Sequence, residues 1–328
     1  MSSYTTISFP GLGLTMDPPQ SFTLGPLTFN LYGILIALGL MLAVVYACRR
    51  CGEFGILEND ILDGVLWITP LAIVCARLYY VAFEWDQYAA DPISILYIWK
   101  GGIAIYGAVI GAAVGVAIHC RIKKIRLPAL LDLVALCFLI GQLIGRWGNF
   151  FNREAFGSET ASFLRMGLEN RWSGETIFVH PTFLYESLWN LVGFLILHKL
   201  SKKRKYDGQI ALGYAAWYGL GRAFIEGLRT DSLYLGPFRV SQVLAAVSCV
   251  AAVCVLLWQH FKTHDPKDLF VNRPKEEKAG EPEEKAEEAE EKAEEAEEKA
   301  DEAEEKAEEP EEKAEEKAEE AEEKSEEE

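Results

Sequence analysis

Apolar residues fill stretches of the chain that are roughly 17–22 residues long, the length at which a helix crosses the ~30 Å hydrocarbon core of a bilayer. Lipid-exposed backbone must satisfy its own hydrogen bonds, so these stretches are predicted to be α-helices. Their periodicity alone also fits buried helices of a large soluble core. The regular separation by charged turns favours a polytopic membrane protein. The predicted spans are Leu31–Ala47, Leu62–Phe83, Ile103–Cys120, Ala129–Ile144, Thr182–Leu197, Gln209–Ile225 and Val240–Trp258.

The segments that flank these spans have a different composition. Residues 1–30 lack the basic start and short apolar core of a secretory signal peptide, and their Pro and Gly content predicts an irregular arm outside the membrane. Residues 261–274 are predicted to be a linker, and residues 275–328 form a Glu/Lys/Ala-rich low-complexity tail. The predicted fold class is an all-α polytopic membrane protein. It has about seven transmembrane helices within residues 31–260, an outer N-terminal arm and an acidic cytoplasmic tail.

The formal net charge of −17 and the mean hydropathy of +0.06 average two unlike parts. Residues 275–328 carry 30 acidic residues and 9 lysines, a net charge of −21, which leaves +4 for the body. The tail has an alanine seam, and alanine buries too little surface for a strong coiled coil. A single charged helix or a disordered segment is favoured over an oligomerisation device. The tail could bind an unknown basic cytoplasmic partner.

Lysine and arginine in short turns predict the orientation of the chain. Basic residues concentrate in the turns after the first, third, fifth and seventh spans, so that face is predicted to be cytoplasmic and the N-terminus outside. The opposite face carries mostly arginines, whose planar fork pairs with phosphate or carboxylate at two points. Snorkelling and local salt bridges are the alternative explanation. The basic residues of the cytoplasmic turns are Arg49, Arg50, Arg121, Lys123, Lys124, Arg126, Lys199, Lys202, Lys203, Arg204, Lys205, Lys262 and Lys267.

The seven cysteines fall within predicted spans or at their cytoplasmic ends, so no disulfide framework is expected. Cys48 and Cys51 form a lone C-x-x-C pair. With no second pair nearby, small core side chains are a better account of it than a metal site.

Ionisable residues inside predicted spans mark function by default, because they are costly in lipid. Arg77 lies in the outer third of the second span, and Glu186 lies about one turn into the fifth. Tyr218, Arg222 and Glu226 are spaced i, i+4 and i+8, so they share one helix face. Arg229 follows on the same side of the membrane. A structural ion-pair network and a polar cavity for an anionic ligand both fit this pattern.

Small residues recur at a spacing of four in the third span, at Gly107, Gly111 and Gly115. Such a ridge lets two helices approach closely. Close packing against another helix is therefore predicted for this face, with Tyr106 just before the ridge.

The outer segment Gly145–Gly157 reads G-R-W-G-N-F-F-N-R-E-A-F-G. A segment that only connects two spans has no need for this combination of arginine, asparagine and glutamate. Arg146 could hold a phosphate, and Asn149 and Asn152 supply donors and acceptors. Glu154 could orient Arg146 or accept a proton. The pattern indicates an anion-binding loop.

This segment resembles the signature G-R-x-G-N-F-x-N-x-E-x-x-G of the phosphatidylglycerol–prolipoprotein diacylglyceryl transferases, and every defined position matches. The resemblance extends from about Ile7 to Trp258. It includes Tyr32-Gly33, Arg77-Leu78, the run His180–Glu186, and Gly221–Glu226 followed by Arg229. One departure stands out. The family commonly has a histidine where this chain has Tyr106, and a phenol with a pKa near ~10 is a poor general base at neutral pH.

The resemblance implies a transferase in the bacterial cytoplasmic membrane that catalyses the first step of lipoprotein maturation. Its substrates would be phosphatidylglycerol, a membrane lipid, and prolipoprotein signal peptides whose cysteine becomes lipid-modified. The products would be a thioether and glycerol phosphate. No metal, soluble cofactor or nucleic acid is expected to take part.

The resemblance also implies which residues form the site. Arg146 and Arg222 would stabilise the departing phosphate, Glu154 or Glu226 would take the thiol proton, and Tyr106 would hydrogen-bond lipid or acceptor. Glu186 could equally be a structural partner. The residues expected to bind substrate are Arg146, Asn149, Asn152, Gly157, Tyr32, Arg77, Glu186, Tyr218 and Arg229.

Two hypotheses from other functional classes are alternatives to an enzyme. A transporter or channel would also place arginines and carboxylates within spans. The clustering of these residues at the outer side and the absence of an evident pair of broken helices count against it. A membrane-anchored scaffold that works through the acidic tail leaves the outer motif unexplained.

Overall fold

The structure is a computed structural model that describes residues 3–25, 27–89, 91–98, 101–229, 234–235 and 238–273. Met1–Arg273 form one compact unit. The predicted tail, residues 275–328, lies outside the described residues.

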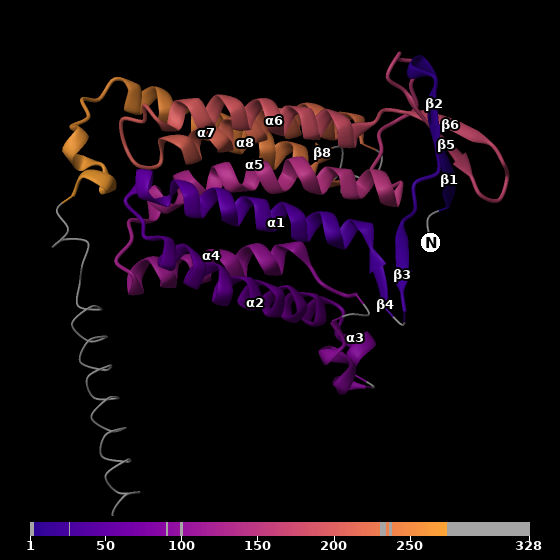
Figure 1. The fold of residues 1–328 in the computed structure, drawn as a ribbon, viewed down its shortest axis with the longest axis horizontal. Coiled ribbons are helices and arrows are strands. Elements are labelled where there is room, and N and C mark those ends of the chain that lie inside the picture. The colour runs from indigo at the N-terminus through magenta and orange to yellow at the C-terminus, as the bar shows by residue number, and fades with distance from the viewer. Residues whose placement is uncertain are drawn as a thin grey trace, which may run out of the picture. The chain divides into compact units, whose positions relative to one another are not determined.

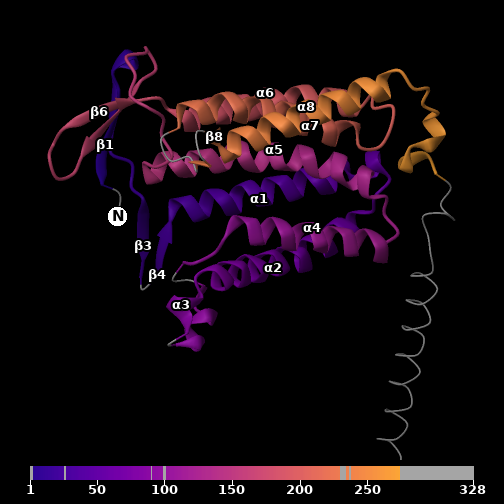
Figure 2. The same cartoon turned by 180° about the vertical axis from the view of Figure 1, so that it is seen from behind.

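Long helices account for most of the described chain, and they lie side by side (Figures 1 and 2). Each predicted apolar stretch falls within or overlaps one of them. A short helix, α3 (Trp85–Tyr88), follows the second. The long helices are α1 (Leu31–Arg50), α2 (Glu58–Phe83), α4 (Ile105–Ile122), α5 (Leu127–Asn152), α6 (Thr182–Ser201), α7 (Gln209–Ile225) and α8 (Val240–His260).

Five of these helices, α1, α2, α4, α5 and α8, are long and apolar enough to cross a membrane, which agrees with a polytopic membrane protein. Helix α7 has 17 residues, one fewer than the 18 that we require of a membrane-spanning helix. Helix α6 buries polar side chains along its length, among them Glu186, Ser187 and Asn190.

Small residues set the distances between neighbouring helices. The predicted glycine ridge of α4 packs against α2, as expected. A Cβ added at Gly107 would lie 2.4 Å from the carbonyl oxygen of Cys75, and one at Gly111 would lie 2.6 Å from its Cβ. Helices α6 and α7 meet through Trp189 and Trp217, whose rings stack with centroids 4.4 Å apart. Each indole N–H donates to the other residue's carbonyl oxygen at 3.0 Å.

A buried aspartate fixes the start of α7. Asp132 of α5 is fully buried, and its carboxylate accepts hydrogen bonds from the backbone N–H groups of Gly208, Ile210 and Ala211 at 2.8–2.9 Å. The first N–H groups of a helix have no partner within the helix. Asp132 supplies that partner from a neighbouring helix.

The prediction of an all-α fold with an irregular N-terminal arm is wrong in one respect, because the arm contains β-strands. Ile7 and Phe9 are the buried residues of the first strand, and they pack in one cluster with Phe150 and Leu168. The antiparallel sheet has the order β2-β1-β5-β6 and pairs Ile7 with Leu168. Two hairpins, β3–β4 and β7–β8, complete the set. The strands are β1 (Tyr4–Phe9), β2 (Leu14–Met16), β3 (Ser21–Leu24), β4 (Leu27–Asn30), β5 (Met166–Asn170), β6 (Thr176–Val179), β7 (Tyr234–Leu235) and β8 (Phe238–Arg239).

The strands gather at one end of the helix bundle, which we call the strand-bearing end (Figure 1). The lysine-containing turns and the segment after α8 lie at the opposite, lysine-rich end. The strand-bearing end includes the last turns of α5 and the first turns of α6.

Candidate active site at the strand-bearing end

The motif segment Gly145–Gly157 is helical from its start to Asn152. The sequence places the end of this span near Ile144, whereas α5 continues to Asn152. Arg146, Asn149 and Asn152 are spaced by three residues, so they share one face of its last turns. Helix α5 ends where Arg153 adopts a left-handed conformation with φ of 55°.

Glu154 folds back onto the asparagines of α5. Its Oε1 accepts hydrogen bonds from the Nδ2 atoms of Asn149 and Asn152 at 3.1 and 3.2 Å. Arg146 donates through Nη1 to the Oδ1 atom of Asn149 at 3.4 Å. These four predicted site residues therefore form one hydrogen-bonded group. Glu154 itself is solvent-exposed.

Arginines from two helices and the following turn converge on Glu186, which is 4 % exposed. The Nη2 atom of Arg146 lies 2.6 Å from Glu186 Oε2. The Nη1 atoms of Arg222 and Arg229 each lie 3.4 Å from Oε1. Arg222 also pairs with Glu226 at 2.6 Å across one helix turn. We call these five residues the arginine–glutamate cluster. Three arginines and two buried glutamates thus contact one another in this cluster.

Glu226 is held from α8 as well as from α7. It is 2 % exposed, and its Oε1 accepts a hydrogen bond from the hydroxyl of Ser241 at 2.5 Å. Arg239 donates to its backbone carbonyl. Ser241 is not among the residues predicted from the sequence. The position of Ser241 at the start of the last predicted span was its only sequence signal.

Gly157 brings the end of the motif to the cluster. Its N–H donates to the carbonyl of His180 at 2.9 Å, and it forms an isolated β-bridge with Arg229. A Cβ added there would lie 2.7 Å from the Cβ of His180. The predicted site glycine therefore lies where three backbone segments meet at van der Waals distance.

The predicted arginine of the second span has a different set of partners. Arg77 is 5 % exposed, and in the described part of the chain its guanidinium donates to four backbone carbonyls, at distances of 2.6–2.9 Å. It also lies over the ring of Tyr88 at 5.0 Å. These bonds tie α2 to the segment before α4. Its acceptors are Ile95, Gly101, Gly102 and Ser94.

The predicted tyrosines occupy three settings. Tyr32 packs on Gly148, where an added Cβ would lie 2.4 Å from its ring. Tyr218 stacks on Tyr214 with centroids 5.6 Å apart, one turn before Arg222. Tyr106 is 56 % exposed, and its ring centroid lies 6.4 Å from that of Tyr79 on α2. The structure thus gives Tyr106 an exposed aromatic environment on α4.

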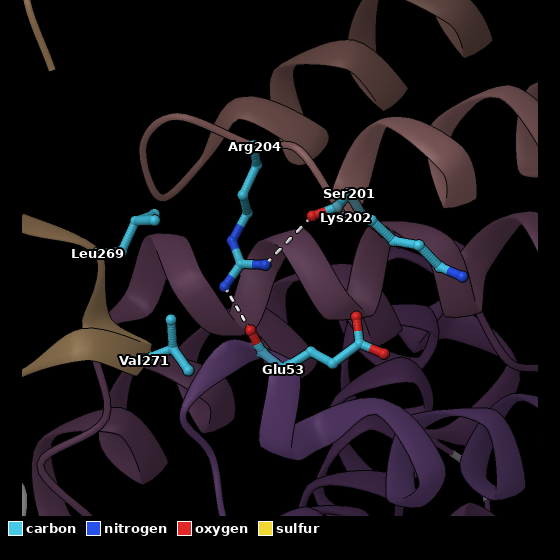
Figure 3. A pocket seen from close by; sticks show the side chains of 6 residues that line it. All are labelled: Glu53, Ser201, Lys202, Arg204, Leu269 and Val271. Atoms are coloured by element: carbon cyan, nitrogen blue, oxygen red, sulfur yellow. Dashed lines mark hydrogen bonds between the residues drawn. The ribbon is translucent and has the colours of Figure 1, made fainter. Parts of the chain in front are cut away.

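A separate cavity of about 230 Å³ opens at the lysine-rich end (Figure 3). Ser201 on its wall is fifteen positions after Glu186 in the same helix, which corresponds to roughly 22 Å along the axis. Arg204 lines this cavity and donates to the carbonyl of Glu53 at 2.6 Å. The cavity is therefore not part of the arginine–glutamate cluster.

Comparison with known proteins identifies the family. The sequence model described as prolipoprotein diacylglyceryl transferase matches residues 19–258. A protein named phosphatidylglycerol–prolipoprotein diacylglyceryl transferase from Lysinibacillus sphaericus is 43 % identical over 253 residues, covering 74 % of this chain and 93 % of the relative. Proteins of the same name are 43 % identical in Limosilactobacillus reuteri, over 74 % of this chain and 92 % of the relative, and 41 % identical in Listeria welshimeri, over 78 % and 95 %. Because the family model matches residues 19–258 and relatives more than 40 % identical cover about three quarters of the sequence, the chain belongs to the prolipoprotein diacylglyceryl transferase family.

Proposed function

We propose that the arginine–glutamate cluster binds the phosphate of phosphatidylglycerol and that the chain transfers the diacylglyceryl group to the cysteine thiol of a prolipoprotein. The convergence of Arg146, Arg222 and Arg229 on Glu186 is the observation that carries this proposal. A lipid phosphate diester bears one negative charge, and arginine pairs with phosphate at two points. The family of the chain supports the same substrates.

The reaction is an alkylation of sulfur. The thiolate attacks the glycerol carbon that bears the phosphate, a C–S bond forms, and the C–O bond to phosphate breaks. Glycerol phosphate leaves with the electron pair of that bond. The nucleophile belongs to the substrate, so the enzyme needs no cysteine of its own.

Two tasks fall to the residues of the site. Arg146 and Arg222 stabilise the charge that develops on the departing phosphate, and positioned charge acts strongly where water is scarce. The same cations lower the pKa of the incoming thiol from its ordinary value near ~8.5. Arg229 adds to this field from the turn after α7. Asn149 and Asn152 bind headgroup oxygens through their amides.

We assign the thiol proton to Glu154 rather than to Glu226. Glu226 is buried, and both Arg222 and Ser241 contact its carboxylate. Glu154 is exposed and accepts only from the asparagine amides among the described residues, so a proton can pass from it to water. Tyr106 contacts lipid or acceptor without taking the proton.

We further propose that α6 and α7 complete seven transmembrane helices within residues 31–260. The lysine-rich end then faces the cytoplasm, with the linker 261–274 and the tail 275–328 on that side, and the arm 1–30 lies outside. The uneven distribution of lysine supports this orientation. It puts the cluster at the outer leaflet of the bacterial cytoplasmic membrane.

Incubation of the purified protein with phosphatidylglycerol and a peptide containing the lipoprotein cysteine tests the function. Mass spectrometry of the peptide should detect a thioether-linked diacylglyceryl group, with release of glycerol phosphate in equal amount. A peptide with serine in place of the cysteine is the control and should gain no lipid. If the folded, lipid-replete protein leaves the cysteine peptide unmodified, the proposed function is wrong.

A further inference from the structure

The turn that carries Glu154 contains two residues in a left-handed conformation that are not glycine. Arg153 has φ of 55° and Ala155 has φ of 56°. Residues with a Cβ atom adopt this conformation at a cost in free energy, and such a turn persists only when its surroundings hold it. The contacts of Arg153 and Ala155 therefore decide how the carboxylate between them is aimed.

Ala155 is held from α6, because Thr182 donates through its hydroxyl to the Ala155 carbonyl at 2.5 Å. Arg153 is held from the N-terminal arm. Its side chain is 3 % exposed and pairs with the carboxylate of Asp17 at 2.5 Å. Its guanidinium also donates to the carbonyls of Thr5 at 2.5 Å and Pro18 at 2.8 Å.

The same guanidinium donates back to the end of α5, at the Phe151 carbonyl, at 3.1 Å. The Arg153 guanidinium is thus hydrogen-bonded to β1, to the connection between β2 and β3, and to the last turn of α5. Gln20 adds a second contact from the arm to this turn, a hydrogen bond of 3.4 Å to the Asn152 carbonyl. Burial lowers the pKa of Arg153 from its ordinary value, as expected for a cation largely removed from water.

We propose that Arg153 is a positioning residue that uses the N-terminal arm as an anchor to lock the turn aiming Glu154 at Asn149 and Asn152. The family signature leaves position 153 open, so the matching motif does not assign this role. The inference rests on the proposed function, since it concerns the same site. A chain of contacts then runs from the arm through Arg153 and Glu154 to Asn149 and Arg146.

Two substitutions separate positioning from general stability. Arg153→Gly removes the anchor while suiting the left-handed backbone, because glycine adopts positive φ without strain. Arg153→Lys keeps the charge and loses the planar fork that reaches three segments. Arg165→Lys is the matched control. Arg165 also donates to backbone carbonyls, and among the described residues these belong to Ala161 and Ser162 of its own loop.

The first readout is steady-state transfer with phosphatidylglycerol and the cysteine peptide. Misplacement of reacting groups lowers turnover, so we expect kcat to fall about 10- to 100-fold in Arg153→Gly and by a smaller factor in Arg153→Lys. KM for phosphatidylglycerol should stay within about twofold, because the arginine–glutamate cluster is intact. The control should match the wild type. Wild-type kcat in Arg153→Lys would overturn the proposal, whether or not the glycine variant folds.

The second readout does not depend on the reaction. Amide hydrogen exchange should be faster in residues 4–9 and 149–155 of Arg153→Lys than in the wild type, while exchange in α6 and α7 is unchanged. Unchanged exchange in residues 149–155 would overturn the proposal even if turnover fell. If the wild-type protein transfers no lipid, the proposed function fails, and hydrogen exchange still decides whether Arg153 positions the turn.

Discussion

Glu186→Gln is the substitution that most directly tests the arginine–glutamate cluster. It keeps the shape of the side chain and removes the charge that Arg146, Arg222 and Arg229 share at 2.6, 3.4 and 3.4 Å. Two unit charges about 4 Å apart attract by about 4 kcal/mol at an effective dielectric constant of about 20, so three pairs give about 12 kcal/mol before desolvation. Desolvation costs several kcal/mol per buried ion and offsets most of this attraction.

The net effect should still be destabilising, because Arg146, Arg222 and Arg229 would all lose the carboxylate that they contact. Loss of one member of a buried ion pair costs about 3–5 kcal/mol, and we expect the lower value, because the side chain of Arg146 is 21 % exposed. For a body of this size, about 3 kcal/mol corresponds to a fall in melting temperature of roughly 6–12 °C. Turnover should fall at least about tenfold, because Arg146 loses its closest orienting partner.

Thermal unfolding and lipid transfer should be measured on the same purified protein in detergent with phosphatidylglycerol. Asp63→Asn is the matched control. Asp63 pairs with Lys123 at 2.6 Å, but its side chain is 48 % exposed, and an exposed pair contributes at most about 1 kcal/mol. If Glu186→Gln melts and turns over like the wild type, Glu186 does not hold the cluster together and the reasoning fails.

Four further outcomes are expected. Arg146→Ala and Arg222→Ala should each abolish lipid transfer while the protein remains folded in membranes; normal turnover in both would remove the proposed phosphate roles. Tyr106→Phe should keep kcat within about tenfold of the wild type, because an exposed phenol is not the base, and complete loss in a folded protein would make the hydroxyl essential. Gly221→Ala should lower the free energy of unfolding by about 1–3 kcal/mol, because the added Cβ would lie 2.2 Å from the indole nitrogen of Trp189 on α6. Thermal unfolding measures this, and an unchanged melting temperature would contradict the close packing. Asp132→Asn should lower the free energy of unfolding by about 1 kcal/mol in the same assay. The NH2 group of the asparagine would face at least one of the three backbone N–H groups that now donate to the carboxylate. A stabilised variant would argue against the capping role of Asp132.

The long helices and their close packing could be predicted from the sequence. An apolar stretch of membrane-spanning length is a local property, so each predicted stretch falls in or overlaps a helix of the structure. The glycine spacing in α4 predicted close packing, because a missing side chain matters wherever another helix approaches. The i, i+4 spacing of Arg222 and Glu226 likewise predicted a shared helix face, and the two side chains pair at the end of α7.

The partners of these residues across the fold could not be predicted from their own positions. From the sequence, Glu186 could be either a structural partner or a substrate ligand. Its position between three arginines depends on how α5, α6 and α7 pack. Arg77 and Arg153 looked like members of one outer set of arginines. In the structure, Arg77 donates hydrogen bonds to four backbone carbonyls, whereas Arg153 donates to Thr5 and Asp17 of the N-terminal arm.

The sequence by itself determined where the apolar helices lie and which chemical groups lie at one end of them. The length of an apolar stretch and the residue types beside it are properties of a short segment of the chain. The tertiary structure alone decided that the arm pairs as strands with a segment far along the chain, that the motif continues α5, and that three arginines converge on Glu186. Hydrogen bonds and ion pairs form between atoms a few ångströms apart, and distance in sequence does not set that separation.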